Sequence, residues 1–144
     1  MYACTFFGHR ECPGSIEPKL REVLIDLIEN HAVRMFYVGK QGEFDIMVRT
    51  LLKDLVLAYP HINYAVVLDR IPNKPDSYDT CDCSDTMLPE GIELVHPRFA
   101  ISWRNKWMIN RSDYVVTYVT HSWGGAAQFA ELAEKQKKII ISLI

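Results

Sequence analysis

The 144-residue sequence has no long apolar run and no excess of positive charge. A membrane-spanning helix needs roughly 20 consecutive apolar residues, so we expect no span across a bilayer. The first residues, 1–8, lack a basic region followed by a long apolar one, which argues against a secretory signal and favours the cytoplasm. The formal net charge of −2 argues against bulk electrostatic binding to nucleic acid.

Cysteine is sparse and poorly spaced for metal binding. The four cysteines stand at positions 4, 12, 81 and 83, and they form no pair of CxxC knuckles. The interval between Cys81 and Cys83 is too short for a usual zinc hook. We therefore expect free thiols in a reducing compartment and no metal site.

The motifs of several common enzyme classes are also missing. The sequence contains no GxGxxG fingerprint, no GxxxxGK[ST] loop and no GxSxG elbow. These absences argue against an ordinary NAD-binding domain, a P-loop ATPase and a serine hydrolase with a nucleophile elbow. We predict no cofactor.

What the sequence does contain is an alternation of short apolar runs with helical patterns. Apolar or β-branched runs predict strands at 3–7, 35–38, 64–68, 92–95, 114–119 and 138–143. Apolar residues at the helical period predict helices at 15–30, 44–59, 99–111 and 125–136. This alternation over residues 1–144 predicts one α/β domain, Rossmann-like and three-layered, with a mainly parallel sheet. The polar stretch at 72–89 is predicted to be a lid or flap.

Glycine follows the predicted strands at three places. In a parallel sheet the carboxyl ends of the strands meet at one edge, where ligands bind. Glycine lets an anion approach the unpaired N–H groups of the next helix. The predicted ligand-binding residues are Gly8, His9, Arg10, Gly39, Gln41, Gly42, Asp45, Ser122, Gly124 and Gly125. The alternative is that these glycines only form turns and that Ser122 only caps a helix.

The segments Phe6-Phe-Gly-His-Arg10 and Gly39–Asp45, together with the paired glycines at 124 and 125, resemble the SLOG superfamily. The resemblance covers nearly the whole chain. It implies a Rossmann-like domain that binds a nucleotide or a nucleotide-derived small molecule, as a sensor or as a processing domain. In the DprA branch of that superfamily, the ligand is single-stranded DNA.

The segment Gly124–Glu131, GGAAQFAE, is similar to the PGGxGTxxE motif of the LOG phosphoribohydrolases. Trp123 replaces the proline of that motif, while Ala127 and Gln128 replace its third glycine and its threonine. Arg104 and Met108 stand at the interval of an arginine and a methionine in LOG proteins. The resemblance implies that Arg104 and Glu131 form a catalytic pair that cleaves the N-glycosidic bond of a nucleotide monophosphate.

Plainer interpretations of these residues remain open. Glu131 lies on the side of its predicted helix away from the apolar stripe, where it would be solvated. Arg104 would be a surface arginine packed over a tryptophan. Trp103 and Trp107 form a predicted apolar stripe with Ala100, and such tryptophans more often belong to a core or an interface than to a platform for bases. Together with the dimers among LOG-like proteins, that stripe predicts a homodimer.

Overall fold

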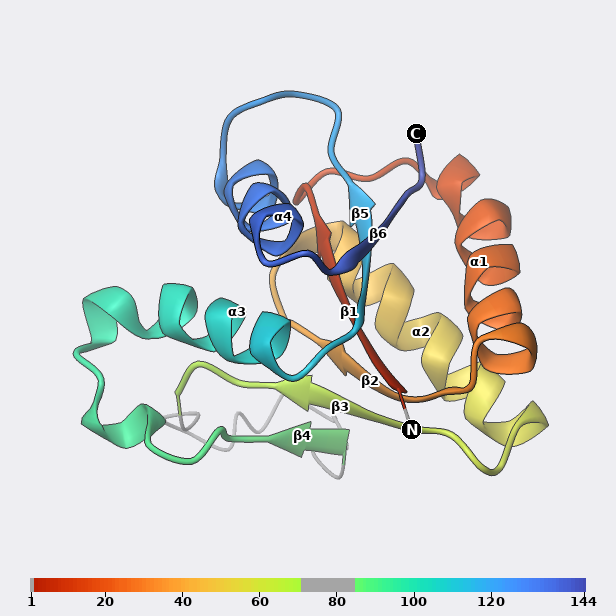
Figure 1. Ribbon diagram of the computed structural model, residues 1–144, viewed down its shortest axis with the longest axis horizontal. Helices are drawn as coiled ribbons and strands as arrows, with labels where there is room; N and C mark the ends of the chain where they lie inside the picture. The colour runs from red at the N-terminus through yellow and green to blue at the C-terminus, as the bar shows by residue number, and fades with distance from the viewer. Residues whose placement is uncertain (1, 71–84) are drawn as a thin grey trace, which may run out of the picture.

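The computed structural model describes residues 2–70 and 85–144 (Figure 1). Within this part, six parallel strands form one sheet in the order β4-β3-β2-β1-β5-β6. The strands are β1 (Tyr2–Gly8), β2 (Val33–Val38), β3 (Asn63–Val67), β4 (Thr86–Met87), β5 (Tyr114–Tyr118) and β6 (Ile139–Ser142). The α-helices are α1 (Glu17–Asn30), α2 (Gly42–Ala58), α3 (Ala100–Asn110) and α4 (Gly125–Lys135), and the short 3₁₀ helices are η1 (Gly14–Ile16), η3 (Ile92–Leu94) and η4 (Pro97–Phe99).

The helices cover both faces of the sheet. Helices α1 and α2 pack on one face, whereas α3 and α4 lie on the other (Figure 1). Because side chains alternate across a strand, Phe6 of β1 enters the core beneath α1 and α2, and its neighbour Phe7 enters the core beneath α4. Phe7 stacks on Phe129 of α4 with ring centroids 5.8 Å apart. The three-layer α/β fold with a parallel sheet is thus confirmed.

The strand order reverses beside β1. From β1 the chain moves one way through β2 and β3 to β4, and then returns to place β5 on the opposite side of β1. The loops that leave β1 and β5 therefore diverge to opposite faces of the sheet. Such a point leaves a crevice beyond the carboxyl ends of the two strands, which is where open α/β sheets bind their ligands.

Most predicted elements are present with boundaries shifted by a few residues, but the segment at 92–95 is not a strand. It contains η3 instead, which follows Gly91 in a left-handed conformation with φ 93°. The predicted flap at 72–89 falls largely outside the described residues. At its described end, Thr86 and Met87 pair with β3 as an edge strand, so this part is not a flap.

The buried face of α3 also differs from the predicted stripe. Ala100 is buried as expected, but Trp103 and Trp107 are only half-buried, and the buried face carries Arg104, Asn105, Met108 and Ile109. Trp107 packs edge-on against Tyr37 within the chain. The homodimer stays a prediction, with less unpartnered tryptophan surface to favour it.

Other sequence-based expectations concern the bilayer and the thiols. Among residues 2–70 and 85–144, no helix combines the length and the apolar character that a membrane crossing requires. Cys4 and Cys12 are buried free thiols, whereas Cys81 and Cys83 lie outside the described residues.

Gly42 provides a test of how the loop after β1 packs against α2. Its φ is +89°, and a Cβ placed on it would lie 2.6 Å from the Cα of Arg10. We predict that Gly42→Ala lowers the free energy of unfolding by roughly 2–5 kcal/mol, because a strained backbone angle is combined with a backbone clash. Urea denaturation measures the change.

Gly14→Ala is the matched control, because no atom of residues 2–70 or 85–144 lies within 4 Å of the added Cβ. It is expected to stay close to the wild type. A Gly42→Ala protein as stable as the Gly14→Ala protein would contradict this account of the loop.

Candidate functional site

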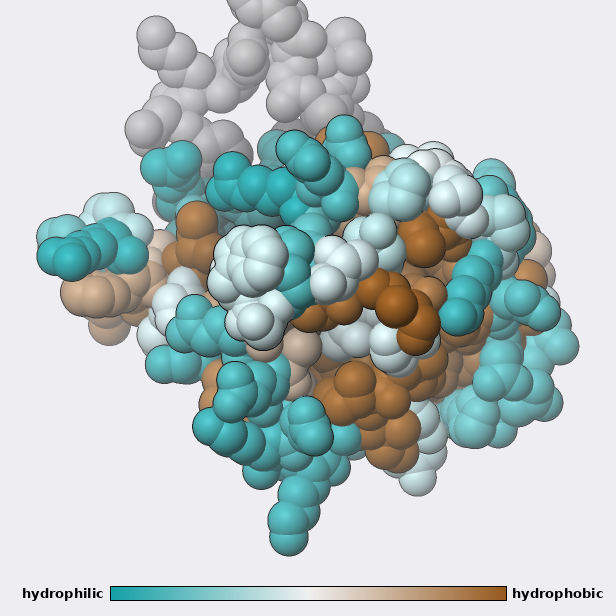
Figure 2. All heavy atoms as spheres, turned by 90° about the horizontal axis from the view of Figure 1, so that it is seen from above, coloured by the Kyte–Doolittle hydropathy of each residue, from teal (hydrophilic) through white to brown (hydrophobic). Residues whose placement is uncertain are grey.

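A cavity of about 490 Å³ lies at the carboxyl edge of β1, β2 and β5, where the strand order reverses. It is lined by the loops after these strands, by α3 and by the start of α4. Figure 2 views the molecule from above Figure 1, where the loop between β5 and α4 stands at the top. Hydrophobic residues gather in the middle of this face, with hydrophilic residues around them.

Arg104 is the most unusual of the cavity residues, because its side chain is charged and only 2% of the residue is exposed. Its Nε and Nη2 donate hydrogen bonds to Oδ1 of Asn105, at 3.2 and 2.9 Å. Its Nη1 is buried and has no hydrogen-bond partner among the described residues. Burial lowers the pKa of Arg104, which the negative charges of Asp45 and Asp69 oppose. An unsatisfied donor on a buried cation is unfavourable, so this atom calls for an explanation.

Asp45 is a buried carboxyl group in the same cavity. Burial raises its pKa from 3.8 to about 6, even though the backbone N–H of Gln41 and the charge of Arg104 both favour the ionised form. The Gln41 N–H donates to Oδ2 of Asp45 at 2.8 Å. The pKa shifts of Asp45 and Arg104 both disfavour the charged forms, because the loss of solvation outweighs the attraction between the two groups.

Gly39 brings these two side chains close to the end of β2. A Cβ on Gly39 would lie 2.9 Å from Oδ2 of Asp45 and 3.2 Å from Nη2 of Arg104. Because Gly39 has no side chain, α2 can place the Asp45 carboxyl group, and α3 the Arg104 guanidinium, at this strand end. Glycine serves here as a spacer inside the site.

Hydrogen bonds join the loop after β1 to the start of α2 and to the segment after β5. The backbone N–H of Glu43 donates to the carbonyl of Arg10 at 2.7 Å, and the carboxylate of Glu43 accepts from the N–H of Cys12 at 2.8 Å. On the other side, the N–H of Thr120 donates to Nε2 of His9 at 2.8 Å. These bonds fix the loop against the start of α2 and the end of β5.

Three aromatic rings form a continuous stack at the rim of the cavity. His9 and His121 are stacked with centroids 3.7 Å apart, and His121 and Trp123 are stacked at 3.9 Å. Burial lowers the pKa of His9, and the charge of His121 lowers it further. This agrees with the Thr120 bond, because Nε2 can accept a hydrogen bond only when it carries no proton.

The N-terminus of α4 closes another side of the cavity. Gly124 has φ 93° and ψ 172°, a conformation that favours glycine, and both Gly124 and Gly125 line the cavity. Among the residues that the structure describes, no side chain caps this helix start. The start of this 11-residue helix, with its unpaired first N–H groups, therefore borders the same cavity as Arg104, whose Nη1 has no partner among the described residues.

The fold resembles that of DNA processing protein A from Helicobacter pylori. That protein was solved to explain how it binds single-stranded DNA. The two chains are 16% identical, with a TM-score of 0.59 over 98% of this chain, which spans 64% of the length of that chain. The likeness shows a shared fold. No protein-family model and no curated protein sequence matches the chain.

The cavity brings together most of the residues predicted from the sequence. Its lining includes Gly8, His9, Arg10, Gly39, Gln41, Asp45, Arg104, Gly124 and Gly125. Gly42, Ser122 and Glu131 are not among the lining residues. Gly42 packs beneath Arg10, and Ser122 is exposed. Glu131 is exposed on α4 and forms an ion pair with Lys135 at 3.3 Å.

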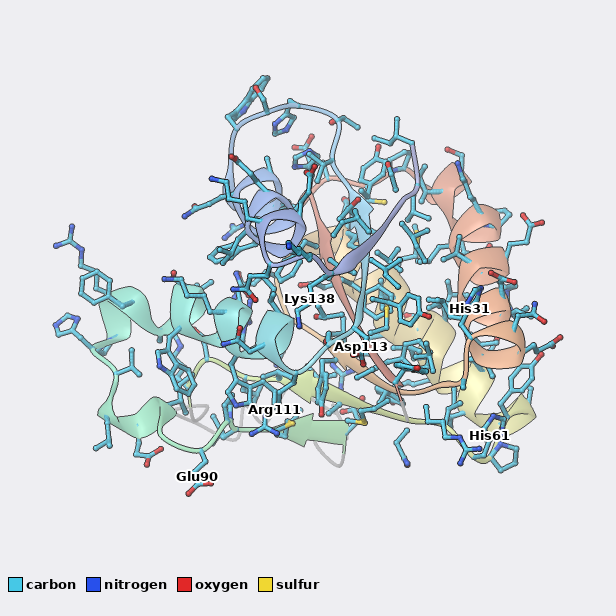
Figure 3. The ribbon with its side chains drawn as sticks, viewed as in Figure 1. His31, His61, Glu90, Arg111, Asp113 and Lys138 are labelled. Carbon is cyan, nitrogen blue, oxygen red and sulfur yellow. The ribbon has the colours of Figure 1, made fainter. Side chains whose placement is uncertain are left out.

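The interpretation of Arg104 as a surface residue over a tryptophan does not fit its burial. It is Arg111 that lies over Trp107, with its guanidinium carbon 4.5 Å from the ring centroid. Figure 3 shows Arg111 near Asp113, at the start of β5 and far from the loop that follows β5. Arg104 lines the cavity, but its basic neighbours Lys106 and Arg111 do not.

Nine lining residues were not predicted as site residues, and the polar or aromatic ones with most bearing on the site are Asn105, His121 and Trp123. In the sequence, Trp123 stands out only as a departure from the LOG motif. A polar pair such as Arg104-Asn105 on the buried side of a helix is the signal that could have identified Asn105.

Asp45 provides a test of the buried charge arrangement. Its folded-state pKa is raised, so the native state holds the proton more tightly than the unfolded chain does. Stability is therefore greatest below the unfolded pKa and is lost as the pH rises through the folded value. We predict that the free energy of unfolding of the wild type, relative to Asp45→Asn, falls by about 3 kcal/mol between about pH 3.5 and 7.

Urea denaturation at several pH values measures this difference. Asp54→Asn is the control, since Asp54 is an exposed carboxylate of the same helix. Parallel pH profiles for the wild type and Asp45→Asn would show that Asp45 has no raised pKa.

Proposed function

We propose that this protein binds a nucleotide or a nucleotide-derived small molecule in the cavity at the carboxyl edge of β1, β2 and β5. The observation that carries the proposal is that Arg104, whose buried Nη1 has no partner among the described residues, lines the same cavity as the start of α4. An arginine N–H and helix N–H groups together suit a phosphate oxygen.

The electrostatic balance of the cavity supports a phosphate bound through donors. Arg10 is exposed at the rim and can add a further charge-assisted bond. Asp45 would repel a phosphate if it were ionised, but its raised pKa favours the protonated form near a second negative charge. A phosphate on the α4 side would leave the acid free to contact a hydroxyl or a ring nitrogen of the ligand.

A volume of about 490 Å³ is within the ordinary range for small-molecule sites. A sensor would use the polar groups only to hold the ligand. A processing enzyme would also need an acid or a base near the glycosidic bond. The cavity contains such a group in Asp45, whose pKa of about 6 suits proton transfer near neutral pH.

N-glycosidic hydrolysis by the pair Arg104 and Glu131 is the alternative taken from the LOG resemblance. The ion pair of Glu131 with Lys135 and its exposure give this version less support than binding has. Chromatography for a released base, after incubation with nucleotide monophosphates, separates a sensor from a hydrolase. Release that persists unchanged in Glu131→Gln and Arg104→Ala would remove this pair from the mechanism.

Single-stranded DNA is a further candidate ligand, because the Helicobacter protein of the same fold was studied for that binding. Its support here is an exposed tryptophan at the rim of the cavity. The net charge of −2 and the position of Arg111 away from the cavity weigh against it.

Gly125→Ala tests the phosphate site without disturbing the fold. In the described part of the chain no atom lies within 4 Å of an added Cβ, so the variant should fold and remain as stable as the wild type. A methyl group at the first helical position would obstruct a ligand held on the helix N–H groups. We predict that it weakens AMP binding about tenfold or more, a change of about 1.4 kcal/mol measured by isothermal titration calorimetry.

Gly14→Ala is the control, because its Cβ also meets nothing within 4 Å and Gly14 does not line the cavity. AMP is one member of a thermal-shift panel of nucleotides and ribosyl phosphates. Equal affinity of the wild type and Gly125→Ala for every member that binds would refute a phosphate site at α4. A panel with no binder would refute the proposed function.

A further inference from the structure

The ring stack at the cavity rim has a feature that packing does not explain. Trp123 is 69% exposed although its ring lies flat on His121, with an interplanar angle of 18°. One broad face of the indole is therefore covered by His121, and most of the rest of the side chain faces solvent. A large, rigid aromatic surface of this kind, at the edge of a polar cavity, is a platform on which another flat ring can stack.

The stack is held in place by hydrogen bonds from different parts of the chain. The ring Nε2 of His9 accepts from the backbone N–H of Thr120, 111 residues away in sequence. The backbone N–H of His9 donates to the carbonyl of Tyr118 at 3.2 Å. Nδ1 of His121 lies 2.9 Å from the carbonyl oxygen of Trp123. The histidine rings thus form a support for the indole before any ligand arrives, which lowers the ordering entropy that a loose side chain would lose on binding.

The platform also has a fixed relation to the start of α4. Trp123 directly precedes Gly124 and Gly125, so its Cα lies within about 7.6 Å of the Cα of Gly125, two peptide units along the chain. In a nucleotide a single ribose separates the base from the 5′-phosphate. A phosphate on the first N–H groups of α4 would therefore leave the base within reach of the indole.

We propose that His9, His121 and Trp123 form a stacking shelf that binds an unpaired nucleobase on the free face of Trp123. This inference rests on the proposed function and assigns the base-binding part of that site. Recognition through the face of the base tolerates different bases, because each has a π-face and no hydrogen-bonding edge is read. The base can belong to a free nucleotide or to a single strand of nucleic acid, since the stacking chemistry is the same.

The test compares ligands with and without a base. Isothermal titration calorimetry gives the affinity for AMP and for ribose 5-phosphate in the wild type, Trp123→Ala, Trp123→Phe and His121→Ala. We expect the wild type to prefer AMP on the order of tenfold. Trp123→Ala should lose this preference and keep its affinity for ribose 5-phosphate. Trp123→Phe should retain most of the preference, and His121→Ala should reduce it because the indole loses its support.

Phe99→Ala is the matched control. Phe99 is an exposed aromatic residue, 58% exposed, that does not line the cavity, and its removal should change neither affinity. A ten-residue deoxyadenosine oligonucleotide forms a second arm. If Trp123→Ala weakens the oligonucleotide and AMP does not bind, the base comes from a nucleic acid strand. If Trp123→Ala weakens AMP binding and the oligonucleotide does not bind, the base belongs to a free nucleotide.

The outcomes separate the shelf from the phosphate site. A wild type that binds AMP and ribose 5-phosphate equally would overturn the shelf and leave the proposed function intact. A preference for AMP that persists in Trp123→Ala would also overturn the shelf and leave the proposed function intact. Equal loss of both ligands in Trp123→Ala would show that the indole only supports the α4 terminus. Failure of the wild type to bind AMP, ribose 5-phosphate and the oligonucleotide would overturn the proposed function and the shelf together.

Discussion

The burial of the Arg104 guanidinium is the constraint on which the candidate site depends. An arginine that is 2% exposed must be compensated, and Asn105 and the nearby charge of Asp45 do this in part. Nη1 remains unpaired among the described residues. Gly39 leaves the space that the side chains of Arg104 and Asp45 occupy beside the end of β2. The site thus contains one strong donor, Nη1 of Arg104, that has no partner among the described residues. A bound anion would supply that partner.

The sheet topology decides where this donor lies. Because β5 returns to the other side of β1, the loops after these strands diverge and leave a crevice between them. Helix α3 reaches the crevice with Arg104, and α4 begins there with Gly124 and Gly125. The proposed binding rests on this arrangement. Turnover would also need a group that moves a proton, and Asp45 in the cavity is better placed for that role than the exposed Glu131.

The sequence predicts the layers and strands well because continuous apolar runs and glycines mark buried parallel strands. It also predicts most of the cavity residues, since strand-end glycines must meet at one edge. The predicted buried face of α3 was wrong. Tryptophan is more apolar than arginine, so the sequence pattern placed the tryptophans inside, whereas the fold buries Arg104 and leaves Trp103 half-buried. The ring stack could not be predicted, because His9 meets His121 only through the pairing of β1 with β5. No local pattern carries such a contact.

The most direct test of the central claim is a crystal structure of the complex with AMP. The account predicts a phosphate oxygen within about 3 Å of Nη1 of Arg104, with other oxygens on the backbone N–H groups at the start of α4. The adenine would lie against the outer face of Trp123. A phosphate bound elsewhere, with Nη1 of Arg104 paired to a protein group or left unpaired, would contradict it.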